Sequence, residues 1–260
     1  MSTKKMEKSE KKQKSYPFLD DIKSLKNKRI IVFGGSFNPP HIGHIETAKK
    51  LYNAVDCDAV LFLFSQNRFK DENAYAPTLH RKKMVDLLAS RFDDTPIIYS
   101  DAENELGTSI TADVLASLQD RHPEAEFMWS MGADSLAGFH KWERYEVIAD
   151  NCPIIVIGRP GYNEDALNSE TAKEYKKCFY NSESDFEKRT SKNGIIFLED
   201  FDIDMSSSSF LKKLRENPDQ DFDEMQVIAD YIKDNNLYGL DTPKANRKKK
   251  RKKRTKMGLP

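Results

Sequence analysis

The sequence predicts an α/β protein built on a doubly wound parallel sheet. Short apolar runs alternate along the chain with segments whose apolar residues recur at spacings of three and four. The 260 residues are enough for one such domain to bury a core without a disulfide or a metal. The three cysteines form no Cys-x-x-Cys pair, so we expect neither a disulfide framework nor a cysteine zinc site.

The first half of the chain supplies four of the expected strands. The apolar run 29–33 ends at Gly34 and Gly35, which is typical of a buried strand that stops at a turn. Residues 42–55 follow with one apolar face at helical spacing. The other elements expected here are a strand at 59–63, a loop at 65–77, a helix at 79–91, a weak strand at 96–99, a helix at 109–120 and a strand at 126–131.

The second half continues the alternation with one interruption. Short helical stretches after Gly132 lead to a strand at 153–157, and 195–198 is the last expected strand. Residues 164–193 are polar and patternless, which predicts an insertion with some helix and little of the core. The remaining expected elements are a helix at 144–151, a helix from the Ser-rich cap at 206–209 to 216, and a closing helix at 222–234.

Ligands bind beyond the carboxyl ends of the strands in sheets of this class, near the point where the strand order reverses. Repeated strand–helix units with right-handed crossovers place those ends along one edge. We therefore expect the loops after residues 33, 63, 131 and 157 to meet there.

The formal net charge of zero hides a strong asymmetry. Residues 1–28 carry net +5 and residues 244–260 net +10, which leaves −15 on the body. We divide the chain into a basic N-terminal extension at 1–28, a central domain at 29–240 and a Lys/Arg-rich tail at 241–260, and we expect both basic termini to be disordered. An acidic body makes a nucleic-acid groove along it an unfavourable hypothesis.

The tail leaves several partners open, among them RNA, a membrane face or another acidic partner, or solvent alone. No apolar run approaches the roughly 18 residues that span a bilayer, and the first 28 residues lack the apolar stretch of a signal peptide. We expect a cytoplasmic protein that does not enter a membrane. A homo-oligomer stays open.

The segment 34–44, Gly-Gly-Ser-Phe-Asn-Pro-Pro-His-Ile-Gly-His, is the most informative in the chain. Its glycines let a ligand approach the backbone closely, and the following helix N-terminus favours a phosphate. His41 and His44 are three residues apart, so both rings can point at one anion. We interpret the segment as a nucleotide phosphate site with backbone donors around Gly35, Ser36 and Phe37. The alternative is a tight turn whose histidines only cap or pack.

This pattern resembles the signature of the nucleotidyltransferase superfamily that carries His-x-Gly-His after its first strand. The segment 131–142, Met-Gly-Ala-Asp-Ser-Leu-Ala-Gly-Phe-His-Lys-Trp, followed by 153–162, is similar to bacterial nicotinate-nucleotide adenylyltransferases. The resemblance implies a Rossmann-like nucleotidyltransferase fold. It also implies that Gly132 and Asp134 lie on ATP, that Trp142 stacks on the pyridine ring, and that Arg159 meets the mononucleotide phosphate. Considered alone, these residues also fit a core ring, a helix cap and a surface ion pair.

Two further segments extend the resemblance over about residues 30–238. The loop 65–70 implies that Asn67 and Lys70 lie near the mononucleotide. The segment 108–115 implies that Thr111 helps to recognise the carboxyl or amide group of the pyridine. Ile110 and Val114 replace the Tyr and Thr usual in that family.

The C-terminal motif departs furthest from the family. Residues 205–215 read Met-Ser-Ser-Ser-Ser-Phe-Leu-Lys-Lys-Leu-Arg where the family has Ile-Ser-Ser-Thr-x-Ile-Arg. Without a gap Leu211 falls on the family arginine, whereas a shift of one residue puts Lys212 there. We expect Ser207, Ser208 and Lys212 to contact the triphosphate, and the alternative is a Ser-rich helix cap.

The resemblance implies transfer of AMP from ATP to nicotinate mononucleotide in NAD biosynthesis, with Mg²⁺ bridging the triphosphate and no metal held by the protein itself. His41 and His44 are the expected catalytic residues. Nicotinamide mononucleotide, phosphopantetheine and cytidylyl transfer are the alternatives within the superfamily. A non-enzymatic RNA-binding protein acting through its basic tail is the alternative outside it.

Overall fold

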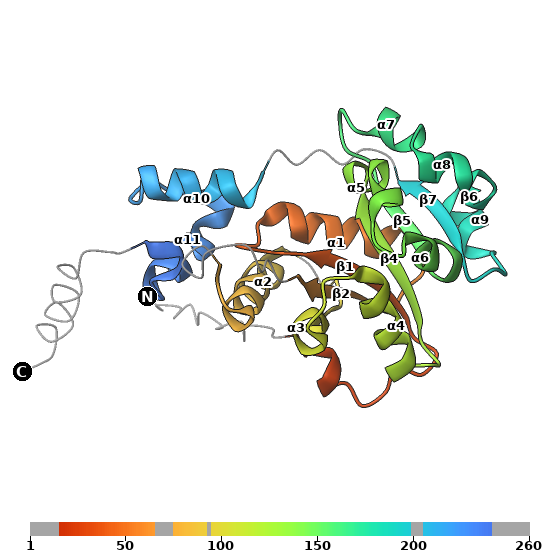
Figure 1. The fold of residues 1–260 in the computed structure, drawn as a ribbon. Helices are drawn as coiled ribbons and strands as arrows, with labels where there is room; N and C mark the ends of the chain where they lie inside the picture. The colour runs from red at the N-terminus through yellow and green to blue at the C-terminus, as the bar shows by residue number, and fades with distance from the viewer. Residues whose placement is uncertain (1–15, 66–74, 93–94, 199–204, 241–260) are drawn as a thin grey trace, which may run out of the picture.

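Seven parallel strands form one sheet with helices on both of its faces (Figure 1). The computed structural model describes residues 16–65, 75–92, 95–198 and 205–240. The strand order is β3-β2-β1-β4-β5-β7-β6. Their bounds are β1 Arg29–Gly35, β2 Ala59–Phe64, β3 Ile97–Ser100, β4 Glu126–Gly132, β5 Pro153–Ile157, β6 Phe179–Tyr180 and β7 Gly194–Leu198.

The helices divide between the two faces of the sheet. One face is covered by α1 (Ile42–Ala54), α2 (Thr78–Phe92), α10 (Ser207–Glu216) and α11 (Gln226–Asp234). The other face is covered by α3 (Ala102–Leu106), α4 (Thr111–Arg121), α5 (Ala133–Ala137) and α6 (Tyr145–Asn151). Single 3₁₀ turns lie at η1 (Leu19–Asp21), η3 (Phe139–Lys141), η4 (Lys176–Cys178), η5 (Asp223–Met225) and η6 (Leu237–Gly239).

The strand β1 lies at the centre of the sheet. Ile30, Ile31 and Val32 are each at most 1% exposed, because helices cover both faces of the strand. Val32 pairs with Leu61 on β2 and with Trp129 on β4. The strand order reverses between β1 and β4, and sheets of this class bind ligands at the carboxyl ends of the strands that flank such a reversal.

The predicted alternation of strands and helices is confirmed. The expectation that 164–193 adds little to the core is wrong, because Ala166, Thr171 and Phe186 are completely buried. That segment forms α7 (Asn163–Leu167), α8 (Glu170–Glu174), α9 (Glu183–Glu187) and the edge strand β6. Each of these elements has five residues or fewer, so none is long enough to show a helical or strand period.

Part of the proposed N-terminal extension packs on the domain. Tyr16, Leu19 and Leu25 are buried, and Phe18 forms a parallel bridge with Tyr99 on β3. The amide of Tyr99 donates to the carbonyl of Pro17 at 3.1 Å. The chain from residue 16 therefore covers the outer edge of β3, which is one way in which proteins protect an edge strand. Residues 1–15 and 241–260, expected to be disordered, lie outside the described residues.

A group of ion pairs joins the amino-terminal ends of β1 and β4 to α9. The Arg29 guanidinium donates from Nε to Glu126 and from a terminal nitrogen to Glu187, both at 2.7 Å. Arg189 also donates to Glu126, and its side chain is 4% exposed. Although burial opposes it, hydrogen bonds to Glu187 and Glu126 raise the pKa of Arg29. These charges fix the α7–α9 segment to the central strands.

None of the described helices is both long and apolar enough to cross a membrane.

Candidate active site

The loops that follow β1, β2, β4 and β5 meet at the carboxyl edge, as the sequence predicts. Arg81 on α2 donates to the carbonyl of Ser36 after β1 at 2.8 Å and to that of Ser65 after β2 at 3.1 Å. Arg159 after β5 pairs with Asp134 after β4 at 3.3 Å. The positive charge of Arg159 also acts on the two histidines that follow β1.

His41 and His44 lie at the start of α1 and face each other closely. Their ring centroids are 3.7 Å apart, with 35° between the ring planes. His41 is the N-cap of α1, so both imidazoles lie beside the unpaired amides of a helix N-terminus. The ring of Phe37 packs edge-on against His44, with a centroid distance of 5.0 Å. The two imidazoles therefore form one rigid unit at the positive end of the helix dipole.

The environment of this pair keeps both rings neutral near pH 7. Burial, with a smaller contribution from Arg159, lowers the pKa of His41 to about 4. Burial, together with His41 and Arg159, holds the pKa of His44 well below its usual range. A neutral imidazole has one N–H donor. Each neutral ring can therefore donate a hydrogen bond to a phosphate without first being protonated.

The proton position on His44 is fixed by the backbone. The amide of His41 donates to Nδ1 of His44 at 3.0 Å, and a nitrogen that accepts this bond carries no proton. Neutral His44 therefore carries its proton on Nε2, the outer nitrogen of the ring. Nδ1 of His41 is buried and has no hydrogen-bond partner among the described residues.

The loop between β1 and α1 is held by aromatic packing. Phe37 has a positive φ of 44°, a conformation that costs a non-glycine residue about 1 kcal/mol. Its ring is completely buried between Phe33, Phe62 and Phe64. A Cβ atom on Gly35 would lie 2.8 Å from that ring. Phe37 therefore has only its backbone to offer a ligand, and its side chain belongs to the core.

Gly132 and Asp134 lie where β4 ends and α5 begins. Asp134 pairs with Arg159, although the resemblance assigns the two residues to different substrates. A side chain on Gly132 would collide with the carboxylate of Asp134 and approach Nε of Arg159 to 3.1 Å. A side chain at this position would therefore displace this ion pair. Both charged side chains are more than one-third exposed, so they are accessible to ligands.

Trp142 and Thr111 lie on the face of the sheet opposite α1. Trp142 is half-buried, and its ring packs edge-on against Phe139 at 5.3 Å and Trp129 at 6.3 Å. Thr111 is the first residue of α4. An ion pair between Asp113 and Arg144 joins the first turn of α4 to the chain just after Trp142. Partly exposed Trp142 and Thr111 are thereby held on neighbouring elements.

The Ser-rich segment contacts the loop between β1 and α1 through one residue. The hydroxyl of Ser207 donates to the carbonyl of Pro39 at 2.8 Å, while Ser206 is the N-cap of α10. The N-terminus of α10 therefore lies beside the loop that precedes α1. Ser208 is exposed. Lys212 is also exposed and lies 3.9 Å from Glu216 on its own helix, while Leu211 is buried.

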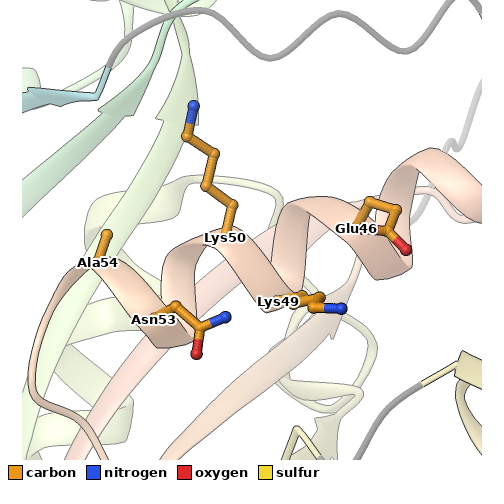
Figure 2. A pocket seen from close by; sticks show the side chains of 5 residues that line it. All are labelled: Glu46, Lys49, Lys50, Asn53 and Ala54. Atoms are coloured by element: carbon orange, nitrogen blue, oxygen red, sulfur yellow. The ribbon is translucent and has the colours of Figure 1, made fainter.

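Asn67 and Lys70 lie outside the described residues. One hollow on the described surface has a volume of about 400 Å³ and lies over α1 (Figure 2). Its lining residues are Glu46, Lys49, Lys50, Asn53 and Ala54. Lys50 and Asn53 point to opposite sides of the helix in Figure 2, and the hollow includes none of the predicted site residues.

Sequence reasoning missed two residues that hold the site together. Asn38 accepts hydrogen bonds at its Oδ1 from the amide of Ala76 at 3.0 Å and from the hydroxyl of Tyr238 at 2.9 Å. Arg81 is 1% exposed and bonds to two strand-end loops. A pattern did exist for Arg81, because it lies in register with Met84 and Leu88 on the apolar face of the predicted helix.

Comparisons with known proteins identify the family of this chain. The family described as cytidylyltransferase-like matches residues 32–214. A Rhizobium johnstonii protein named "Probable nicotinate-nucleotide adenylyltransferase" is 39% identical over 145 residues, which cover 55% of this chain and 71% of that protein. A Methylorubrum extorquens protein of the same name is 37% identical over 148 residues, covering 56% of this chain and 78% of that protein.

A solved structure shares the fold. The nicotinic acid mononucleotide adenylyltransferase of Plasmodium falciparum, complexed with NaAD, superposes with a TM-score of 0.60. The match covers 82% of this chain and 98% of that one at 20% identity. At that identity the likeness establishes the α/β nucleotidyltransferase architecture and carries no residue assignments.

Proposed function

The chain belongs to the cytidylyltransferase-like family and, within it, to the nicotinate-nucleotide adenylyltransferases, and we propose on that premise how it works. It transfers the AMP of ATP to the 5′-phosphate of nicotinate mononucleotide. The products are nicotinate adenine dinucleotide and pyrophosphate, and the reaction is a step of NAD biosynthesis. The observation that carries the proposed mechanism is the close pair of neutral imidazoles at the N-terminus of α1.

The reaction needs no base and no covalent intermediate. An oxygen of the mononucleotide phosphate attacks the α-phosphorus of ATP, and the bond from that phosphorus to the bridging oxygen of the β-phosphate breaks. The electron pair leaves with pyrophosphate, and the nucleophile is already ionised near neutral pH. Catalysis then consists of positioning two anions and stabilising the charge that develops on the α-phosphate. His44 would donate from Nε2, and His41 would bind the same phosphate.

Three sources of positive potential offset the repulsion between the two substrates. The N-termini of α1 and α10 lie on the same loop, and each contributes a partial positive charge. The third source is the charge of Arg159, which adds to the effect of burial in lowering the pKa of His41. The hydroxyls of Ser207 and Ser208 would donate to the terminal phosphates of ATP. Lys212 would have to leave its ion pair with Glu216 to contact the same phosphates.

Mg²⁺ would arrive with ATP. The described residues contain no group of three His, Cys, Asp or Glu side chains that could hold a metal ion. The donor set therefore fits a cation held by the phosphate oxygens better than one held by the protein. Bound in this way, Mg²⁺ neutralises charge on the triphosphate. The remaining positive potential comes from the chain itself.

The mononucleotide would bind toward α4 and Trp142. The exposed part of the Trp142 ring offers a platform for the pyridine, and Thr111 a hydroxyl for its carboxyl group. Arg159 would release Asp134 to meet the mononucleotide phosphate, which leaves Asp134 free to accept from hydroxyls of the nucleotide. Asn67 and Lys70 complete the proposed set.

A coupled assay of dinucleotide formation tests this function directly. Nicotinate mononucleotide, nicotinamide mononucleotide and phosphopantetheine are each offered with ATP and with CTP in the presence of Mg²⁺. We expect the highest kcat/KM for ATP with nicotinate mononucleotide. The proposal would be contradicted if the chain used CTP but not ATP, or phosphopantetheine but neither pyridine mononucleotide.

A deletion of residues 244–260 separates catalysis from the tail. Adenylyl transfer should survive the deletion because the residues proposed for it lie in the body. A protein that acts only by binding RNA would show no transfer, and would lose a salt-sensitive affinity together with the tail.

A further inference from the structure

Arg81 is the most buried charged side chain that the structure describes. It is 1% exposed and lies on the inner face of α2 beside Met84, Val85 and Leu88, each 0% exposed. Burial lowers its pKa, and the charges of Asp101 and Glu103 act in the opposite direction. Burying a cation in an apolar layer is costly unless it makes several hydrogen bonds. Its position therefore calls for an explanation beyond filling space.

The guanidinium of Arg81 joins three segments of the carboxyl edge. It donates to the carbonyls of Ser36 at 2.8 Å, Ser65 at 3.1 Å and Ala76 at 3.0 Å. It also donates to Oγ1 of Thr78 at 3.0 Å. Its Cζ atom lies 4.6 Å from the centroid of the Tyr75 ring and 5.1 Å from that of the Phe64 ring. Only a planar fork of donors reaches these oxygens at once.

The bond to Ser36 decides which way the next amide points. The carbonyl and the N–H of a trans peptide point in opposite directions. The peptide between Ser36 and Phe37 is not among the cis bonds of the described chain. Arg81 draws the Ser36 carbonyl inward, so the N–H of Phe37 faces away from α2.

The packing of Phe37 removes the remaining freedom of this peptide. The ring of Phe37 is fixed in the core and also contacts His44. The peptide is thus held by Arg81 at its carbonyl and by the aromatic cluster at its other end. An amide held in this way is a preorganised donor, the kind that stabilises charge developing in a transition state.

We propose that Arg81 is a positioning residue, which orients the Ser36–Phe37 peptide so that the Phe37 amide donates to the α-phosphate together with His44. Its buried charge also adds positive potential behind the phosphate loop. This inference rests on the proposed adenylyl transfer. Because Arg81 is 1% exposed and donates to backbone carbonyls, it acts through the backbone and through its charge, and not by direct contact with a substrate.

Arg81→Lys tests the proposal, with Arg189→Lys as the matched control. Arg189 is also a buried arginine over a phenylalanine ring, 4.3 Å from the centroid of Phe186, but it lies at the opposite edge of the sheet. We expect Arg81→Lys to lower kcat by about 10- to 100-fold in folded protein, with a smaller change in the KM for ATP. Arg189→Lys should lower the melting temperature and leave kcat within about twofold, because its pairs lie far from the loop.

A double mutant separates a role in catalysis from a role in folding. If the Phe37 amide and His44 stabilise the same charge, the losses in kcat for Arg81→Lys and His44→Ala will not add. Full additivity, or a kcat in Arg81→Lys within about twofold of the wild type, would overturn the inference. If the wild-type chain itself formed no dinucleotide, that result would instead overturn the proposed function.

Thr78→Val is the second variant, needed if Arg81→Lys does not fold. It removes one acceptor of the guanidinium and leaves the three backbone carbonyls in place. We expect a loss of roughly threefold in kcat with a cooperative melting transition retained. An unchanged kcat in Thr78→Val, where Arg81→Lys is unfolded, would reduce Arg81 to a purely structural residue and overturn the proposal.

Discussion

The two edges of the sheet each bury an arginine, but they give it opposite surroundings. Arg189 at the amino-terminal edge is 4% exposed and pairs with the carboxylate of Glu126, which also binds Arg29. Arg81 at the carboxyl edge is 1% exposed, and the described atoms that accept from it are neutral oxygens. A carboxylate thus neutralises the charge of Arg189, whereas the dipoles of neutral groups, mainly backbone carbonyls, stabilise the charge of Arg81.

This difference shows how one fold can separate stability from binding. The amino-terminal edge uses opposite charges to fasten the α7–α9 segment to β1 and β4. The carboxyl edge carries a buried cation whose described hydrogen-bond acceptors are neutral, two helix N-termini, and a nitrogen of His41 with no hydrogen-bond partner among the described residues. The positive charge and the hydrogen-bonding groups of this edge would be stabilised by a bound anion. The predictions below test whether the two edges are as separable as this comparison implies.

The largest effect on stability should come from Glu126→Ala. The substitution leaves the buried guanidinium of Arg189 without its carboxylate, which costs about 3 kcal/mol or more in the free energy of unfolding. The kcat of the folded protein should not change. Urea denaturation and saturating kinetics measure the two quantities.

Glu124→Ala is the control for that variant. Glu124 pairs with Lys26 at 3.0 Å, but both side chains are more than half exposed, so its loss should cost less than about 1 kcal/mol. Equal destabilisation by the two substitutions would remove the distinction between the buried network and an ordinary surface pair.

The largest effect on rate should come from His44→Ala. Loss of the Nε2 donor should lower kcat by about 10²- to 10³-fold, while far-UV circular dichroism stays that of the wild type. His80→Ala is the control because His80 contacts Tyr231, at 2.9 Å, between α2 and α11. Near-normal turnover in His44→Ala would remove the catalytic assignment of the pair.

Acid should weaken the carboxyl edge through His41. The pKa of His41 is lowered to about 4 in the folded protein, whereas an exposed histidine titrates near 6.5. The unfolded chain therefore gains its proton first as the pH falls from 6.5 to 4. Over that window the protein should lose up to about 3 kcal/mol of unfolding free energy through this group.

His41→Asn isolates this contribution, because asparagine does not titrate. Urea denaturation at a series of pH values should show a shallower acid dependence for the variant than for the wild type. Identical slopes between pH 4 and 6.5 would mean that burial of His41 is not coupled to folding.

The smallest effects should come from the serines at the start of α10. Ser207→Ala removes the bond to the Pro39 carbonyl and should cost about 1 kcal/mol of stability. Ser208 is exposed, so Ser208→Ala should leave stability unchanged. If both hydroxyls meet the triphosphate, each variant should raise the KM for ATP by roughly threefold to tenfold. An unchanged KM in both would restrict these serines to capping and anchoring.

The strand pattern and the meeting of four loops were predictable because each signal is local. Residues 30–33 are apolar, and the glycines and histidines after them specify a turn into a helix. The α7–α9 segment was not predictable, since its buried residues are scattered over elements too short for a period. The pairing of Asp134 with Arg159 also depends on strand order, which no local pattern encodes.

Arg81 falls between these cases. Its place on the apolar face of α2 could be read from the spacing to Met84 and Leu88, but its partners could not. Ser36 and Ser65 follow two different strands, and only the pairing of β1 with β2 brings their carbonyls together. A charged residue in an apolar stripe therefore marks a position of interest, and tertiary structure supplies its purpose.

The described chain begins at Tyr16 and ends at Leu240, and both residues pack on the α2–α11 side of the sheet. The two ends of the described chain therefore lie on the same side of the sheet, and Trp142 and α4 lie on the opposite side, away from both ends.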